Sequence, residues 1–321
     1  MNFWPRFAAA ALACAFILGF VAPAHAQLMG HNTKGDFGLQ SGTQPEPGFY
    51  LSGMFVRYDG DTINDRDGNS IALDPDEKGE LDINAIALGF WWVSPWKILG
   101  ANYGAMAFPA WANNKFQAPI LGVEKKTDLG FSDLYVQPVN LGWHTSRADF
   151  TAGFGLFMPT GRYDADASDN IGMGMWSYEL YAGTTLFFDE AKTWHFATTG
   201  FFEWHGEKEG ADATVGNILT LEGGLGKSYL EGAVQVGVSY YAQFKLTEDD
   251  FGSTPIPPEF EPIPKHRVWG FGPELSVPIA TEKTLYSILS ARYFWEVGAR
   301  STVEGRTLIV TATFPIPSVG L

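Results

Sequence analysis

The stretch LEGAVQVGVSYYAQFKL, residues 230–246, decides the fold of this chain. Its even positions are apolar or small, as at Val236, Val238 and Phe244, and its odd positions are mostly polar, as at Gln235 and Gln243. Successive side chains of a β-strand point to opposite faces, so the stretch predicts a long strand with an apolar and a polar side. It exceeds the usual strand of about 5–6 residues and can cross a bilayer, which takes about 9–11. This alternation is typical of a transmembrane β-barrel.

The same pattern predicts an all-β, antiparallel up-and-down barrel of about 12 strands. The strands are expected near residues 48–58, 81–93, 97–109, 130–143, 147–159, 174–188, 194–205, 217–229, 230–246, 266–279, 284–298 and 304–314. Connections starting near Asp59, Ala110, Thr160, Gly206 and Thr247 are long, and those on the other side, such as Ser94-Pro95-Trp96, are tight. Outer-membrane barrels have short periplasmic turns and long extracellular loops.

The N-terminus predicts export to the envelope of a Gram-negative bacterium. Residues 1–26 combine Arg6, an apolar core from Phe7 to Val21 and a small-x-small site before Gln27, as a cleaved signal peptide does. Residues 27–47 are then a periplasmic segment that could fold into the lumen as a plug. Residues 48–314 form the outer-membrane barrel, and residues 315–321 a C-terminal tail.

Cleavage there has two chemical consequences. It removes Cys14, the single cysteine, which excludes a disulfide framework, a thiolate metal site and a cysteine nucleophile. It also leaves 36 acidic residues against 20 basic ones (21 less Arg6). Nucleic-acid binding needs clustered Lys and Arg, so it is not expected. No cofactor is expected either.

Tryptophan supports the barrel independently. Five tryptophans fall at the short-turn ends of the expected strands (Trp91, Trp92, Trp96, Trp143 and Trp194), and five at the long-loop ends (Trp111, Trp176, Trp204, Trp269 and Trp295). Trp prefers the two membrane–water interfaces. The core of a soluble sandwich, the competing fold, would hold Trp in mid-strand. Contacts with outer-membrane lipid and lipopolysaccharide are therefore expected.

Alternation also assigns the side chains that line the lumen. The candidate solute-binding residues are Asp82, Asp133, Gln137, Glu179, Tyr181, His195, Glu203, Glu222, Tyr241, Lys245, Glu274, Arg292 and Glu296. Inward aromatics that could stack on an apolar solute are Phe90, Trp92, Tyr135, Phe157, Tyr181, Phe201, Tyr241, Tyr286 and Phe294. Two interpretations stay open: an acidic channel lining, or a network of ion pairs and hydrogen bonds that fills a narrow barrel. Twelve strands lie between filled eight-stranded barrels and open porins.

Two further motifs bear on metal binding and catalysis. The acidic loop (Asp59, Asp61, Asp65, Asp67, Asp74, Asp76, Glu77 and Glu80) resembles an EF-hand only faintly, because Ser70 replaces the loop glycine and no Glu closes it. A solvated loop that shares divalent cations with lipid phosphates is preferred. His144-Thr145-Ser146 resembles the His-x-Ser of outer-membrane phospholipases but lies in a periplasmic turn. We therefore expect neither a metal site nor an enzyme.

Several segments together resemble the phenol-degradation meta-pathway transporter family, also called SphA-like. They are DLYVQPVNLGW at 133–143, GFGLFMPTGRY at 153–163, FDEAKTW at 188–194, TLEGGLGK at 220–227, YAQFK at 241–245 and YFWEVGAR at 293–300. The resemblance implies an outer-membrane barrel that passes small hydrophobic or aromatic molecules inward, and it supplies no agreed binding residues. The alternatives are a closed structural barrel and a barrel whose surface loops bind a partner. The oligomeric state is open.

Overall fold

The structure is a computed structural model that describes residues 28–71, 79–118, 123–167, 169–230, 234–253, 261–281 and 284–316. The expected signal peptide therefore lies outside the described residues, as do Asp74, Asp76 and Glu77 of the acidic loop and residues 317–321 of the tail. Pro315 and Ile316, placed in the tail by the sequence, are the last residues of a strand.

The regular secondary structure of the described residues is almost wholly β. After a single 3-10 turn, η2 (Gly38–Gln40), its strands are β1 (Gly48–Ile63), β2 (Glu80–Ile98), β3 (Ala101–Phe108), β4 (Ala110–Ala118), β5 (Val123–Phe131), β6 (Leu134–His144), β7 (Ala148–Met158), β8 (Ser177–Phe187), β9 (Trp194–His205), β10 (Ile218–Tyr229), β11 (Val234–Lys245), β12 (Arg267–Ala280), β13 (Leu285–Arg300) and β14 (Val303–Ile316). Within the described residues, no helix is long and apolar enough to cross a membrane.

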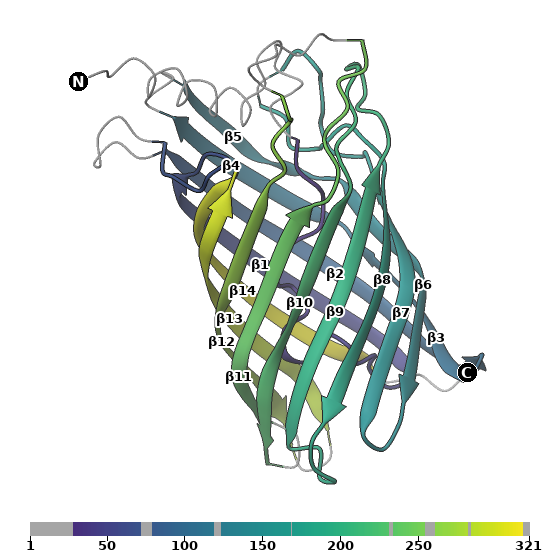
Figure 1. Cartoon of the computed structure of the whole chain (residues 1–321). Helices are drawn as coiled ribbons and strands as arrows, with labels where there is room; N and C mark the ends of the chain where they lie inside the picture. The colour runs from purple at the N-terminus through teal and green to yellow at the C-terminus, as the bar shows by residue number, and fades with distance from the viewer. Residues whose placement is uncertain are drawn as a thin grey trace.

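The strands close into an antiparallel barrel (Figure 1). Neighbours in sequence pair in turn from β6 to β14, and β14 then pairs with β1. The β1–β2 pairing, from Gly48↔Val93 to Gly60↔Leu81, completes the ring through β3 and β6. Closure leaves no free edge around this ring, so the strands of the ring can satisfy their backbone groups without water.

Fourteen segments form twelve wall strands, the number that the sequence predicts. β3 and β4 are two parts of one strand, because both pair with β2 and only Pro109 separates them. β5 and β6 are likewise separated only by Ser132 and Asp133. Proline has no N–H to donate to a ladder, which explains the break at Pro109. The predicted architecture is thus confirmed.

Two connections differ from prediction. The segment after Ala110 is not a loop: β4 and β5 form a hairpin that pairs with the start of β2 and projects beyond the ring on the long-loop side (Figure 1). The β2–β3 turn is not at Ser94-Pro95-Trp96 but at Leu99-Gly100, where both residues have positive φ. Gly100 tolerates that backbone without strain.

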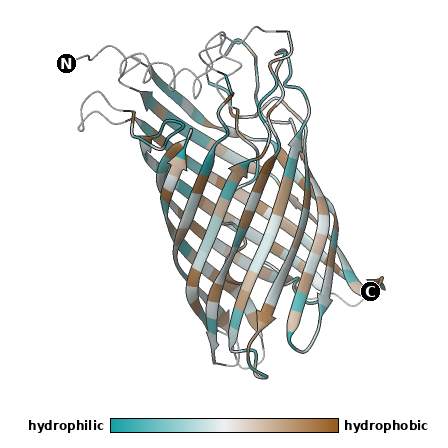
Figure 2. Ribbon diagram, viewed as in Figure 1, coloured by the Kyte–Doolittle hydropathy of each residue, from teal (hydrophilic) through white to brown (hydrophobic). Residues whose placement is uncertain are grey.

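The outer surface of the barrel is mostly apolar. Alternating residues give the strands a banded appearance in Figure 2. Val236 and Val238 on β11, and Phe271 and Leu275 on β12, are between 46% and 54% exposed. In the same β11 strand Ser239, Tyr241 and Gln243 are at most 4% exposed, so the predicted alternation is confirmed there. Trp96, Trp194, Trp269 and Trp295 are also exposed near strand ends, where membrane interfaces favour tryptophan.

Candidate functional site

The candidate site is the barrel interior, which contains a stretch of coil (Figure 1). We call residues 28–46 the inner segment. Leu39, on its 3-10 turn, is 1% exposed and packs against glycines of the wall. A Cβ built on Gly224 or Gly237 would lie 2.7 or 2.6 Å from a Leu39 methyl carbon. Side chains at these positions would collide with Leu39, so the absence of side chains there creates the space it occupies.

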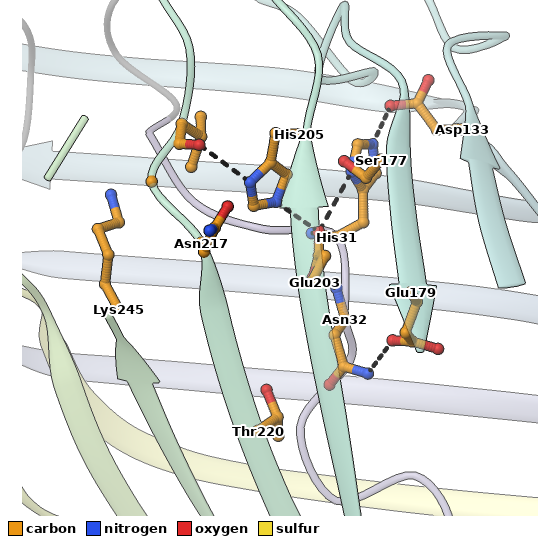
Figure 3. Close-up of polar contacts among 12 residues, drawn as sticks. His31, Asn32, Asp133, Ser177, Glu179, Glu203, His205, Asn217, Thr220 and Lys245 are labelled. Atoms are coloured by element: carbon orange, nitrogen blue, oxygen red, sulfur yellow. Dashed lines mark hydrogen bonds and ion pairs between the residues drawn. The ribbon is translucent and has the colours of Figure 1, made fainter. Parts of the chain in front are cut away.

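His31 makes the densest set of contacts in the segment (Figure 3). Its Nε2 lies 2.8 Å from Asp133 Oδ2, and its Nδ1 lies 2.8 Å from Ser177 Oγ. Its backbone N–H donates to Glu203 Oε1 at 2.6 Å. The imidazole stacks on Phe157, with ring centroids 4.8 Å apart. Burial would lower the pKa of His31, but hydrogen bonds to Asp133 and Glu203 outweigh it, and the pKa is raised.

Asn32 extends this cluster to a third carboxylate, that of Glu179. Its backbone N–H donates to Glu203 Oε2 at 3.1 Å, and its side-chain amide donates to Glu179 Oε2 at 2.8 Å (Figure 3). The wall supports both acceptors: Tyr135 OH donates to Glu179 at 2.7 Å, and His205 Nε2 lies 2.8 Å from Glu203. Both glutamates are 1% exposed. These hydrogen bonds satisfy two buried carboxyl groups, which would be costly without partners.

Lys34 forms a second anchor on the opposite wall. Its Nζ lies 2.7 Å from Glu296 Oε1, and it lies 5.5 Å from the ring centroids of both Tyr58 and Tyr241. The two tyrosine hydroxyls each donate to Glu296 at 2.8 Å. The Glu296 side chain is fully buried. The backbone N–H of Gly305 also donates to Glu296, at 2.9 Å. An isolated buried carboxylate is costly, and Lys34 together with these three hydrogen bonds offsets that cost.

A third anchor surrounds the 3-10 turn. Glu274 accepts a hydrogen bond from the Leu39 backbone N–H at 3.0 Å and pairs with Arg292 at 3.3 Å. Arg292 also donates to the carbonyl oxygens of Gly35 and Asp36. Burial raises the pKa of Asp36 to about 6, only partly offset by its hydrogen bond with Glu222 and the charge of Arg292. This carboxyl group is therefore protonated more readily inside the barrel than in water.

The end of the inner segment contacts the periplasmic part of the wall. Thr43 Oγ1 donates to Asp149 at 3.1 Å, and Gln44 Nε2 donates to Asn140 Oδ1 at 2.5 Å. Asn140 in turn donates to Gln137, at 3.0 Å. The segment is thus hydrogen-bonded to the wall at both ends and in its middle.

Most of the residues that alternation placed in the lumen are buried there. The charged residues that surround the inner segment are Asp133, Glu179, Glu203, Glu222, Glu274, Arg292 and Glu296. Tyr181 stacks on Phe201, with centroids 5.7 Å apart. His195 is fully buried near Gly226, and Lys245 Nζ donates to the Leu28 carbonyl at 2.7 Å and pairs with Asp249. Gln137 and Tyr241 are also at most 1% exposed.

Asp82 is the exception, because the phase assigned to β2 was wrong. Asp82 pairs with Asp59 and Lys115, whereas its neighbour Ile83 pairs with the buried, inward-facing Tyr58. Asp82 therefore lies on the outer face. The same inversion moves Phe90, which is 52% exposed, and Trp92 to the outside.

Tyr286 was also predicted to face inward, but it is 55% exposed.

The wrong assignment of Asp82 has a structural cause. The polar residues near Asp82 belong to the part of β2 that pairs with β4, close to the extracellular end. Side chains near that end can be polar on both faces of the strand, so alternation does not identify the inward face there.

Sequence reasoning missed the contacting residues of the inner segment itself, His31, Asn32, Lys34 and Asp36. They lie in coil, where no periodicity indicates which way a side chain points. The only usable signal was a polar stretch on the periplasmic side of the first strand. Within the described residues, no cluster of three or more His, Cys, Asp or Glu side chains is arranged to hold a metal ion.

Comparison with known proteins places this geometry in a family. No curated protein sequence matches the chain. An outer-membrane channel from Pseudomonas putida F1 superposes with a TM-score of 0.72 at 12% identity, over 89% of this chain and 100% of that one. The β-domain of the Bordetella autotransporter BrkA superposes with a TM-score of 0.50 at 11% identity, over 84% of this chain and 100% of that one.

These likenesses show the fold, a bacterial outer-membrane β-barrel. The family model described as "Putative MetA-pathway of phenol degradation" matches residues 60–312, which is most of the barrel and includes most of the wall residues around the inner segment. The chain therefore belongs to this phenol-degradation family of outer-membrane β-barrel proteins.

Proposed function

We propose that the protein is a gated outer-membrane channel for small hydrophobic or aromatic solutes, and that the inner segment is its plug. The observation that carries the proposal is the way the interior is filled. The wall strands alone do not fill it; a separate coil does, held by side-chain contacts at Asp133, Glu203 and Glu296. A coil without strand pairing can leave without breaking a ladder of the barrel, so the wall survives opening.

The lining of the interior fits aromatic solutes. Tyr135 and Phe157 lie with ring centroids 4.4 Å apart, and Tyr181 stacks on Phe201. Ring faces of this kind stabilise an aromatic guest by stacking. Two similarities support the same assignment: the family is described by phenol degradation, and the Pseudomonas putida F1 protein is an outer-membrane channel. Outer-membrane lipid and lipopolysaccharide would contact the apolar outer surface.

We infer no catalytic function. In the turn that resembles a phospholipase motif, His144 Nδ1 lies 3.2 Å from Asp149 Oδ1. Asp149 also accepts from Thr43 of the inner segment, so this pair has a structural explanation as an anchor of the plug.

The test is single-channel conductance in planar lipid bilayers, comparing the mature protein with a chain that lacks residues 27–46. We expect rare openings from the mature protein and stable open steps from the shortened chain. A deletion strain should also grow more slowly on low concentrations of monoaromatic carbon sources. Silence from both forms, with unchanged growth, would contradict the channel and favour a closed structural barrel.

A further inference from the structure

The His31 ring contacts the barrel wall in the way that a bound ligand contacts its site. Its side chain is 5% exposed, it stacks on Phe157 at an interplanar angle of 16°, and both ring nitrogens have polar partners in the wall. Phe157 is itself backed by Tyr135. We call the surroundings of this ring the His31 recess: Asp133, Tyr135, Phe157, Ser177, Glu179 and Glu203.

The recess belongs to the barrel and is held in shape by contacts that do not involve the inner segment. Asp133 accepts hydrogen bonds from the backbone N–H groups of Gly161, at 2.9 Å, and Met173, at 2.7 Å. Glu203 is held by His205, and Glu179 by Tyr135. The recess therefore stays formed when the segment leaves. Preorganisation of this kind lowers the cost of binding a guest.

The negative charge of the recess, which Asp133 and Glu203 carry, selects among guests. Asp133, Glu179 and Glu203 are all at most 6% exposed. Departure of the inner segment removes the ring and backbone donors of His31 and both donors of Asn32. His205 remains on Glu203, and Lys208 Nζ is bonded to the Met173 carbonyl rather than to a carboxylate. A guest must therefore supply hydrogen-bond donors, and a positive charge is an advantage.

A second ring site lies farther along the segment and differs in chemistry. Phe37 stacks on Phe201, with centroids 5.5 Å apart, and Phe201 stacks on Tyr181. This site offers ring faces to an apolar side chain. It serves as a matched control, because removing the Phe37 ring opens an aromatic space without opening the His31 recess.

Resting on the proposed function, we propose that the His31 recess is a solute-binding site for planar aromatic cations or donor-rich heteroaromatic rings, and that His31 occupies it as an internal mimic of the solute. The recess would take a protonated nitrogen heterocycle in preference to a plain hydrocarbon ring. The inner segment and the solute would then compete for the same carboxylates and the same Phe157 face.

The experiment is chemical complementation with imidazole. Full-length mature protein, refolded in detergent, carries His31→Ala or, as the control, Phe37→Ala, and is titrated at pH 6 with imidazole and with toluene by calorimetry. We expect imidazole to bind His31→Ala at least 10-fold more tightly than it binds the wild type or Phe37→Ala. Toluene should show no such preference for His31→Ala.

Second substitutions make the result specific. Adding Asp133→Asn or Phe157→Leu to His31→Ala should abolish the gain in imidazole affinity. Equal imidazole affinity in His31→Ala and Phe37→Ala, or a gain that survives both second substitutions, would overturn the proposal. If His31→Ala does not fold, as judged by heat-modifiable migration on gels, His31→Ser is titrated in its place under the same criteria.

This binding assay needs no transport. Imidazole complementation with no conductance would leave the recess intact as a binding site and reject the channel. Conductance without complementation would keep the channel and reject the recess.

Discussion

Lys34 is the cation that neutralises Glu296 inside the barrel. Its ammonium group is 2.7 Å from a carboxylate that is fully buried, and two tyrosine hydroxyls and the backbone N–H of Gly305 also donate to that carboxylate. Removing one partner of a buried pair leaves an uncompensated charge, which costs about 3–5 kcal/mol. An exposed pair, by contrast, is worth about 0–1 kcal/mol.

We therefore expect Lys34→Met to weaken docking of the inner segment by about 3 kcal/mol, the lower end of the cost of removing one partner of a buried pair. Arg57→Met is the matched control, because Arg57 pairs with Asp59 where both side chains are more than 40% exposed. Open probability in bilayers and cleavage of the N-terminus by added protease are the measurements. Equal behaviour of the two variants would show that Lys34 does not hold the segment.

Asp82 shows at the same scale why one residue can defeat alternation. It was assigned to the lumen from its place in an alternating pattern, yet it faces outward beside Lys115. The pattern fixes which residues share a face, but the identity of that face depends on the partner strands. The residues of this part of β2 that do face inward are apolar: Ile83, Ala85 and Ala87. No polar side chain therefore marked that face as the inner one.

At the scale of elements, the inner segment is expected to respond to pH. His31 has a raised pKa, so its contribution to docking is complete below about pH 6.5 and is lost as the pH rises through its docked value. Asp36, with a pKa of about 6, favours docking when protonated, and this contribution is lost as the pH rises toward 6. Both signs agree: docking weakens with rising pH.

Open probability should therefore increase from pH 5 to pH 8.5. The groups that face His31 are Asp133 and Glu203, and those that face Asp36 are Glu222 and Arg292. His31→Gln should reduce the change of open probability with pH above about pH 6.5, where His31 loses its proton. Asp36→Asn should reduce that change below about pH 6, where Asp36 loses its proton. A channel that closes as the pH rises would refute the sign of both effects.

The strand elements explain why the wall tolerates a removable occupant. Their hydrogen bonds run from strand to strand, and the inner segment contributes no rung to the ladder. It contacts the wall through side chains and through small residues such as Gly224 and Gly237. The wall is therefore stabilised by its strand ladders, and the inner segment is held by side-chain contacts. The segment can then detach to open the channel without lowering the stability of the wall.

At the scale of the whole molecule, the outer surface must match the bilayer. Val238 is 54% exposed on the apolar face of β11, whereas Asp82 is on the outer face near the extracellular end. A lysine on the lipid face costs about 2–4 kcal/mol at the bilayer midplane and about 0–1 kcal/mol near the interface. We expect Val238→Lys to lower the free energy of unfolding in lipid vesicles far more than Asp82→Lys. Denaturant titration measures both, and equal losses would argue against this membrane position.

The sequence by itself determined the class of fold, the approximate strand count and most of the inward residues. These follow from local physics, because the two-residue period of a strand sorts side chains whenever one face meets lipid. It did not determine the break at Pro109, the β4–β5 hairpin, the phase of β2 or the contacts of His31 and Lys34. Those depend on which strands become neighbours and on where a coil without periodicity finds complementary charge, and only the closed barrel brings these partners together.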